Sequence, residues 1–219
     1  WCNDLDAHLW TAARLHRSLR YTENHDEVRL AHPREWGGHG MAVGRPVSAI
    51  AFALARGPLM LYNGQEVGEP ALNGGGFAGD NARTSIFDYT VMPKLQQWYA
   101  AGHCDGAELS ADSHALRHWY QQLLRLLQDP AFAHGDTFGL NGANIDHPGF
   151  GRLADESHSG HWLYALLRRD SAQASAFLVV ANFHPHLTMQ NVSVRIPAAA
   201  HAWLGCLLYT SDAADEEDS

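Results

Sequence analysis

The stretch RPVSAIAFALARGPLMLYNG, residues 45–64, contains the pattern that decides the fold. Its first half is rich in small apolar residues, with Pro46 where a proline suits the first turn of a helix, and a Gly-Pro pair ending at Pro58 closes it. Its second half, LMLYNG, is a short apolar run that ends in Asn-Gly at Gly64, as a buried parallel strand does before a turn. The stretch predicts a helix followed directly by a buried strand.

The region before this stretch has the same order of elements. Residues 5–18, LDAHLWTAARLHRS, place Leu5, Leu9 and Trp10 near helical spacing, which predicts an amphipathic helix. The short run LRYT, residues 19–22, has the composition of a strand. Helix, strand, helix, strand within about sixty residues is the rhythm of a parallel α/β sheet.

Polar side chains follow both predicted strands. Asn24, His25 and Asp26 come directly after the first strand. Gln65, Glu66 and Glu69 come after the second. The carboxyl ends of parallel strands meet at one edge of a sheet, and α/β proteins build their sites at that edge. The sequence therefore predicts a site that draws on both clusters.

A segment of about thirty-five residues, 67–102, follows the second cluster and is predicted to be a long loop, which in a compact domain is functional or disordered. Its aromatic residues argue against disorder. Trp98 in this loop is a candidate platform for a ligand ring. Trp119 lies on the apolar stripe of the next helix and is expected in the core.

Beyond position 109 the pattern changes to one helix followed by strands alone. Residues 110–129 predict a helix that begins with a Ser110 cap and ends before Pro130. Three strand-like runs follow without a helix between them, at residues 160–169, 175–183 and 188–197. This order predicts a small antiparallel β domain, so the fold class is α/β followed by all-β.

Three of these segments resemble one family. YTENHDEVR, residues 21–29, resembles the fourth signature region of the α-amylase family of glycoside hydrolases, a strand that ends in Asn-His-Asp. GPLMLYNGQEVGEP, residues 57–70, is similar to that family's last barrel strand, and RTSIFDY, residues 83–89, resembles a segment of its bacterial α-amylase group. The resemblance implies that residues 1–130 are the C-terminal part of a TIM (β/α)8 barrel and that residues 131–205 form a small antiparallel β-sandwich domain.

The resemblance also implies roles for single residues. Asp26 would be the carboxylate that stabilises the transition state, and His25 would hydrogen-bond the sugar in the cleavage subsite. Positive charge develops at the anomeric carbon in the oxocarbenium-like transition state, so a fixed anion gains strength as the reaction proceeds. Asn24 would orient its neighbours, Glu66 would shape the rim, and Trp98 would contact substrate.

The implied activity is the retaining cleavage of α-1,4-glucosidic bonds in starch-like glucans. The nucleophilic Asp and the acid/base Glu of the family lie before its fourth signature region, upstream of the residues present here, and retaining hydrolysis needs both. The chain by itself is therefore expected to be inactive. No cofactor is expected in it, and the calcium site common in the family would also lie mainly upstream.

Other interpretations stay open. A transglycosylase or an isomerase of the same superfamily would carry the same motifs. A non-catalytic barrel relative that serves as a binding or partner subunit would commonly have a degraded Asn-His-Asp, which is intact here. Taken alone, residues 24–26 also fit a simple turn cluster, because Asn and Asp side chains bond their own backbone.

Composition excludes several classes of partner. The 219 residues include 24 acidic and 15 basic ones, for a formal charge of −9, and the basic residues form no stripe for nucleic acid. No apolar run approaches the roughly 20 residues that span a bilayer. Three cysteines are too few and too separated for a disulfide framework or a zinc clamp. The expected partner is an α-glucan or maltooligosaccharide, and the sequence makes no prediction about oligomeric state.

The last residues differ in character from the rest. CLLYTSDAADE, residues 206–216, resembles the translation of an adapter used in sequencing libraries, so residues 206–219 are expected to be a non-native tail. They include five of the acidic residues and no base, which leaves −4 for the remainder. A natural acidic tail is the alternative. The start at Trp1 is interpreted as a truncation.

Overall fold

The computed structural model describes residues 5–6, 17–72, 75–76, 79–80, 82–84, 91–172 and 175–205. The α-helices are α3 (Met41–Ala53), α4 (Pro93–Tyr99), α5 (Ala111–Leu126), α6 (Pro130–Ala133), α7 (Asn141–Asn144) and α8 (Ala198–Leu204). Three 3-10 turns are η2 (Trp36–Gly38), η3 (Gln65–Val67) and η4 (Ala100–Gly102). The strands are β1 (Gly75–Gly76), β2 (Gly79–Asp80), β3 (Asp136–Gly139), β4 (Leu163–Asp170) and β5 (Ser175–Asn182).

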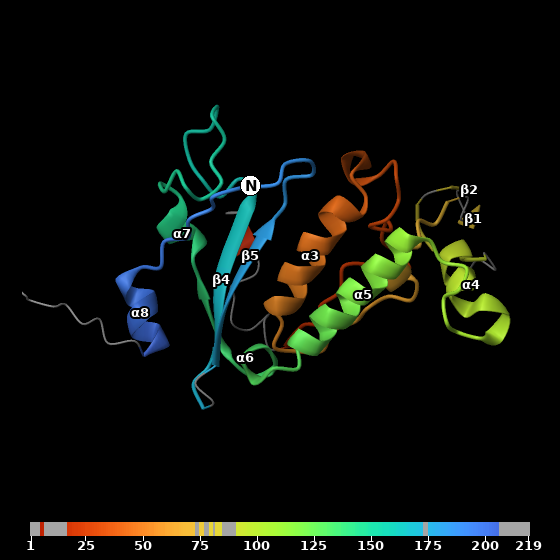
Figure 1. The fold of residues 1–219 in the computed structure, drawn as a ribbon, viewed down its shortest axis with the longest axis horizontal. Helices are drawn as coiled ribbons and strands as arrows, with labels where there is room; N and C mark the ends of the chain where they lie inside the picture. The colour runs from red at the N-terminus through yellow and green to blue at the C-terminus, as the bar shows by residue number, and fades with distance from the viewer. Residues whose placement is uncertain are drawn as a thin grey trace, which may run out of the picture.

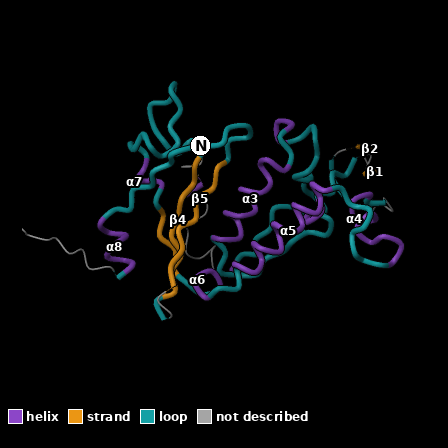
Figure 2. The backbone as a smooth tube through the Cα atoms, in the orientation of Figure 1, coloured by secondary structure: helices purple, strands orange, loops and turns teal. Residues whose placement is uncertain are grey.

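The main sheet has the antiparallel order β3-β4-β5. It lies between α7 and α8 on one side and α3 on the other, with α5 beside α3 (Figure 1). Figure 2 shows the same division between the strands and the helical part of the chain. The antiparallel pairing predicted for the runs at residues 160–169 and 175–183 is present, for example between Leu166 and Val179.

β4 is the central strand, and its two faces belong to two different cores. Tyr164 and Leu166 pack with Ile50 of α3 and with Leu54, which directly follows that helix. The alternate residues Leu163, Ala165 and Leu167 pack on the opposite face, with Ala200 of α8 among their neighbours. Successive side chains of a strand point to opposite faces, so burial of six consecutive residues requires cover on both sides.

The third strand-like run, residues 188–197, is not a strand. It is an extended segment whose side chains alternate, with Val192, Val194 and Ile196 packing on the core under β4. Its backbone is held by a side chain instead of a neighbouring strand: Asn144 Oδ1 accepts from Arg195 N at 2.7 Å, and Asn144 Nδ2 donates to Arg195 O at 3.0 Å. The alternating pattern was correct, whereas the predicted strand was wrong.

Helix α3 begins earlier than predicted. It starts at Met41 after Gly40, so Pro46 lies inside the helix and not in its first turn. The helix ends at Ala53, before the Gly-Pro pair, as expected. Its other apolar face packs against α5, where Phe52 and Ala53 meet Leu116 and Tyr120.

Helix α5 follows the prediction closely. Ser110 is its N-cap, and Ser110 Oγ accepts from Ser113 N at 3.3 Å. Leu116 and Tyr120 are buried, and Trp119 packs on the same core, as its place on the apolar stripe predicted. The helix ends at Leu126, three residues before the predicted end at Asp129, whereas its cap and buried face lie where they were predicted.

The two predicted parallel strands are reduced to one point of contact. Arg20 and Leu59 form a parallel bridge, in which Arg20 N donates to Pro58 O at 3.0 Å and Met60 N donates to Arg20 O at 2.9 Å. The relative direction agrees with the βα rhythm. Nothing else in the described part of the chain continues these two runs as a sheet, so the partial barrel and the sandwich remain predictions.

The segment at residues 67–102 is not one long loop. Its described parts include α4 and η4, and Trp98 lies on α4. The predicted helix at residues 5–18 lies mostly outside the described residues, and the tail from Cys206 lies entirely outside them. No helix among the described residues has the length and hydropathy needed to cross a membrane.

Candidate functional site

The two polar clusters lie beside each other. The parallel bridge at Arg20 brings the ends of both runs to one edge, four residues before Asn24 on one side and four before Asn63 on the other. A hydrogen bond of 2.7 Å from Gln65 Nε2 to Thr22 Oγ1 joins the runs just below the clusters. The parallel pattern predicted this proximity from the sequence.

The triplet at residues 24–26 forms a tight, solvent-facing turn. Asn24 Oδ1 accepts from Asp26 N at 2.8 Å, so Asn24 sets the direction of the backbone at Asp26. His25 Nε2 lies 3.3 Å from Asp26 Oδ2, with 39% of the His25 side chain and 75% of the Asp26 side chain exposed. The turn thus presents a carboxylate with an imidazole beside it, and the turn-cluster interpretation accounts for Asn24.

A buried ion pair closes the loop that carries the triplet. Arg29 Nη1 donates to Glu23 Oε2 at 2.8 Å, and Leu30 N donates to Glu23 Oε1 at 2.7 Å. Both charged side chains are fully buried. Burial raises the pKa of Glu23, and the charge and hydrogen bond of Arg29 offset part of that rise.

The guanidinium of Arg29 also reaches the second strand end and the loop after it. Arg29 Nη2 donates to Asn63 O at 3.0 Å, Arg29 Nε donates to Thr84 Oγ1 at 3.0 Å, and the group lies 4.4 Å from the ring centre of Tyr62. Arg83 Nε donates to the backbone oxygen of Asp26 at 2.6 Å. Arg83 therefore contacts the triplet, and Thr84 contacts the arginine that follows it.

A buried polar network lies beneath the same edge. Gln65 Nε2 donates to Tyr120 Oη at 2.9 Å, and the hydroxyls of Tyr120 and Ser48 are also 2.9 Å apart. The network joins the two strand ends to α3 and α5. Burial raises the pKa of Tyr120 to about 12, so its hydroxyl is neutral and able to donate at physiological pH.

The two glutamates of the second cluster have different environments. Glu66 is half-buried, and its negative charge makes a small contribution to the raised pKa values of Glu23 and Tyr120, which burial mainly causes. Glu69 is fully buried and accepts from Lys94 N at 2.9 Å, at the start of α4. Gly64 has φ +86°, and a Cβ there would lie 2.9 Å from Glu69 Cβ, so the turn requires glycine.

Trp98 has neighbours of its own. The guanidinium of Arg117 lies 5.1 Å from its ring centre, and Trp98 O accepts from Gly106 N at 3.1 Å. Arg117 covers one face of the indole. These contacts connect Trp98 to α5, and they do not join it to the triplet.

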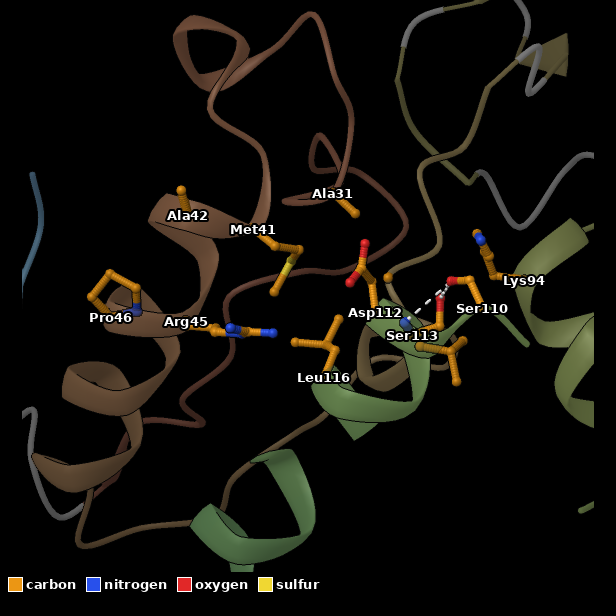
Figure 3. A pocket seen from close by; sticks show the side chains of 12 residues that line it. Ala31, Met41, Ala42, Arg45, Pro46, Lys94, Ser110, Asp112, Ser113 and Leu116 are labelled. Atoms are coloured by element: carbon orange, nitrogen blue, oxygen red, sulfur yellow. Dashed lines mark hydrogen bonds between the residues drawn. The ribbon is translucent and has the colours of Figure 1, made fainter. Parts of the chain in front are cut away.

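A groove of about 720 Å³ lies between α3, η3 and α5, with Arg45 and Met41 on one wall and Asp112 and Leu116 on the other (Figure 3). None of Asn24, His25, Asp26, Glu66 and Trp98 lines it. The chemistry expected of the triplet therefore belongs to the open edge and not to this groove.

The metal-ligating side chains of the described residues do not cluster. No three His, Cys, Asp or Glu side chains gather among these residues at metal-ligand distance. His184 Nδ1 already accepts from His186 N at 3.1 Å and from Leu187 N at 2.9 Å. That histidine therefore serves to fold the 182–187 turn.

Comparison of the chain with models of protein families, with curated proteins and with solved structures found no match.

Three residues of the site had no place in the sequence prediction: Glu23, Arg29 and Tyr120. Glu23 and Arg29 lie on either side of the triplet. Their opposite charges, six positions apart around a predicted turn, were the sequence signal for an ion pair. Tyr120 lies on the apolar stripe of a helix, where a tyrosine is expected to be a core residue. Its hydroxyl bonds are visible only once α5 is packed against the strand ends.

Proposed function

We propose that this chain is the C-terminal portion of an α-amylase-type retaining glycoside hydrolase that cleaves α-1,4-glucosidic bonds in starch-like glucans. In this proposal the chain supplies Asp26 as the transition-state carboxylate and His25 as a sugar-binding group. The nucleophile and the acid/base belong to residues upstream of Trp1, and the chain alone does not turn over substrate.

One observation carries the proposal: the parallel bridge at Arg20 brings the triplet and the Gln65-Glu66 cluster to the same edge. The resemblance to the α-amylase family requires that proximity, because both motifs follow neighbouring barrel strands. The exposure of Asp26 also fits, since a carboxylate that meets a sugar from solvent must be accessible before substrate binds. A turn cluster with a purely structural role has no need of an exposed His-Asp pair at that edge.

The test uses the full-length protein encoded by the gene, assayed on a maltooligosaccharide. Asp26→Asn keeps the size of the side chain and removes the negative charge that faces the developing cation, so kcat should fall by roughly 10² to 10⁴, equivalent to a few kcal/mol. A kcat of Asp26→Asn within about tenfold of the parent would remove the role assigned to Asp26.

Two further variants test the smaller contributions that the proposal assigns to His25 and Glu66. His25→Asn should weaken both KM and kcat by a smaller factor, because a sugar hydrogen bond exists partly in the ground state. Glu66→Gln should be milder still if Glu66 only shapes the rim. Circular dichroism confirms that each variant is folded, and product analysis distinguishes hydrolysis from glucosyl transfer or isomerisation.

A further inference from the structure

We propose that the buried Glu23–Arg29 pair is the positioning element of this site: it holds the loop of residues 24–28 so that His25 and Asp26 stand at the strand edge. The consequence for catalysis rests on the proposed function, whereas the consequence for the loop does not. Arg29 touches no reacting group in this proposal, so it is a positioning residue.

The pair closes the loop at its base. Glu23 immediately precedes the triplet, Arg29 follows it by three residues, and both are fully buried while Asp26 is exposed. Both carboxylate oxygens of Glu23 are bonded, one to the Arg29 guanidinium and one to Leu30 N. The five residues between are thereby anchored at both ends, and the Asn24 turn fixes the backbone in their middle.

Arg29 also fixes the loop relative to the rest of the site. Each of its three nitrogens has a different partner: Nη1 donates to Glu23, Nη2 to Asn63 O and Nε to Thr84 Oγ1. Arg29 N donates to Ala82 O at 2.8 Å as well. One side chain thus joins the triplet loop, the second strand end and the 82–84 segment, which are far apart in the sequence.

Burial explains why this pair suits a positioning role better than a stabilising one. A buried ion pair gains little net stability, because desolvation of both charges offsets their attraction. Loss of one partner leaves a buried charge without compensation and is strongly destabilising. The arrangement therefore tolerates a single geometry, which a site that must hold a carboxylate within a fraction of an ångström requires.

Arg29→Lys is the decisive variant. A lysine keeps the charge, but its single ammonium cannot reach three partners arranged in a planar fork. In the full-length protein, kcat on a maltooligosaccharide should fall by about 10²-fold while KM changes by less than about threefold, because the loop is displaced and the rest of the sugar site is intact. Amide hydrogen exchange across residues 24–28, measured by mass spectrometry, should become at least about tenfold faster.

Arg168→Lys is the matched control. Arg168 is equally buried, and its guanidinium also has three partners, the backbone oxygens of Ala131 and Phe132 and the hydroxyl of Thr137. It lies in β4, in the other half of the molecule. Its substitution should lower stability in the same way and leave both kcat and exchange at residues 24–28 unchanged.

Thr84→Val is a milder second variant in case Arg29→Lys does not fold. It removes the oxygen that accepts from Arg29 Nε at 3.0 Å and keeps the shape of the side chain and the ion pair. It should lower kcat by a smaller factor than Arg29→Lys, with faster exchange at the same residues.

The outcomes separate the two proposals. A parent protein that does not cleave the oligosaccharide contradicts the proposed function, and exchange at residues 24–28 still tests the anchor. Unchanged exchange in Arg29→Lys, or an equal change in Arg168→Lys, overturns the positioning inference. Faster exchange with parental kcat also overturns it, because the loop would then have moved without consequence for the site.

Discussion

Single side chains at the candidate site divide into two groups by burial. Glu23, Arg29 and Tyr120 are buried and hydrogen-bond other groups of the protein, whereas His25 and Asp26 face solvent. Buried polar groups need partners, since each unpaired one costs about 1–3 kcal/mol. The buried residues therefore specify one geometry, and the exposed residues His25 and Asp26 remain accessible to a ligand.

Tyr120 permits a test of the network that is independent of any activity. Burial holds its pKa at about 12, above the ordinary value of 10.0, so its contribution to stability is complete below pH 10 and is lost as the pH rises through about 12. Tyr120→Phe should lower the free energy of unfolding at neutral pH by about 1–2 kcal/mol. It should also remove part of the alkaline loss, at most about 1.4 kcal/mol per pH unit.

Urea unfolding between about pH 8 and pH 12 measures both effects of Tyr120→Phe. Tyr21→Phe is the control, because Tyr21 is 41% exposed. Parallel stability curves for the parent and Tyr120→Phe above pH 10 would contradict the assignment of a buried, neutral hydroxyl.

Among helices and strands, accurate predictions came where local and tertiary signals agree. α5 has both a cap and an apolar stripe, and β4 pairs with β5 as the patterns indicated. The 188–197 segment alternates like a strand, yet the side chain of Asn144 takes the place of a neighbouring strand. Alternation reports which side chains are buried, and it says nothing about which group satisfies the backbone.

Asn144 should therefore be essential for that segment. Asn144→Ala removes its bonds to Arg195 N, Arg195 O and Leu140 O, so stability should fall by about 2–4 kcal/mol, at about 1 kcal/mol for each hydrogen bond with some extra cost for unpaired groups. Hydrogen exchange at Arg195 N should become faster than in the parent. Gln190→Ala, at an exposed position of the same segment, should change neither quantity.

The chain in its entirety combines a closed half and an open half. The β part has a sheet covered on both faces of its central strand. At the other end of the described residues, two runs meet in a single parallel bridge, between Arg20 and Leu59. A parallel pair needs neighbouring strands and helices on both faces to be stable, which is the cover that a complete barrel would supply.

Residues 1–205 expressed alone should consequently be poorly soluble and inactive on starch. Strand edges and apolar surface that the proposal assigns to contacts with the rest of a barrel would be exposed to other molecules. Analytical size exclusion together with a reducing-sugar assay measures both properties. Turnover of a maltooligosaccharide by this purified segment would contradict both the expected inactivity and the assignment of the nucleophile to upstream residues.

The sequence by itself determined the cap and stripe of α5, the antiparallel pairing of β4 with β5 and the proximity of the two polar clusters, because each follows from local periodicity or from the direction of parallel strands. Only the tertiary structure decided that Glu23 and Arg29 are buried together, that Tyr120 bonds Gln65, that Glu69 holds the start of α4 and that Asn144 replaces a strand. Those contacts join residues whose partners are chosen by packing in three dimensions. The sequence does not identify the hydrogen-bond partner of a charged or amide side chain, because burial and hydrogen bonding depend on the surroundings that the fold creates.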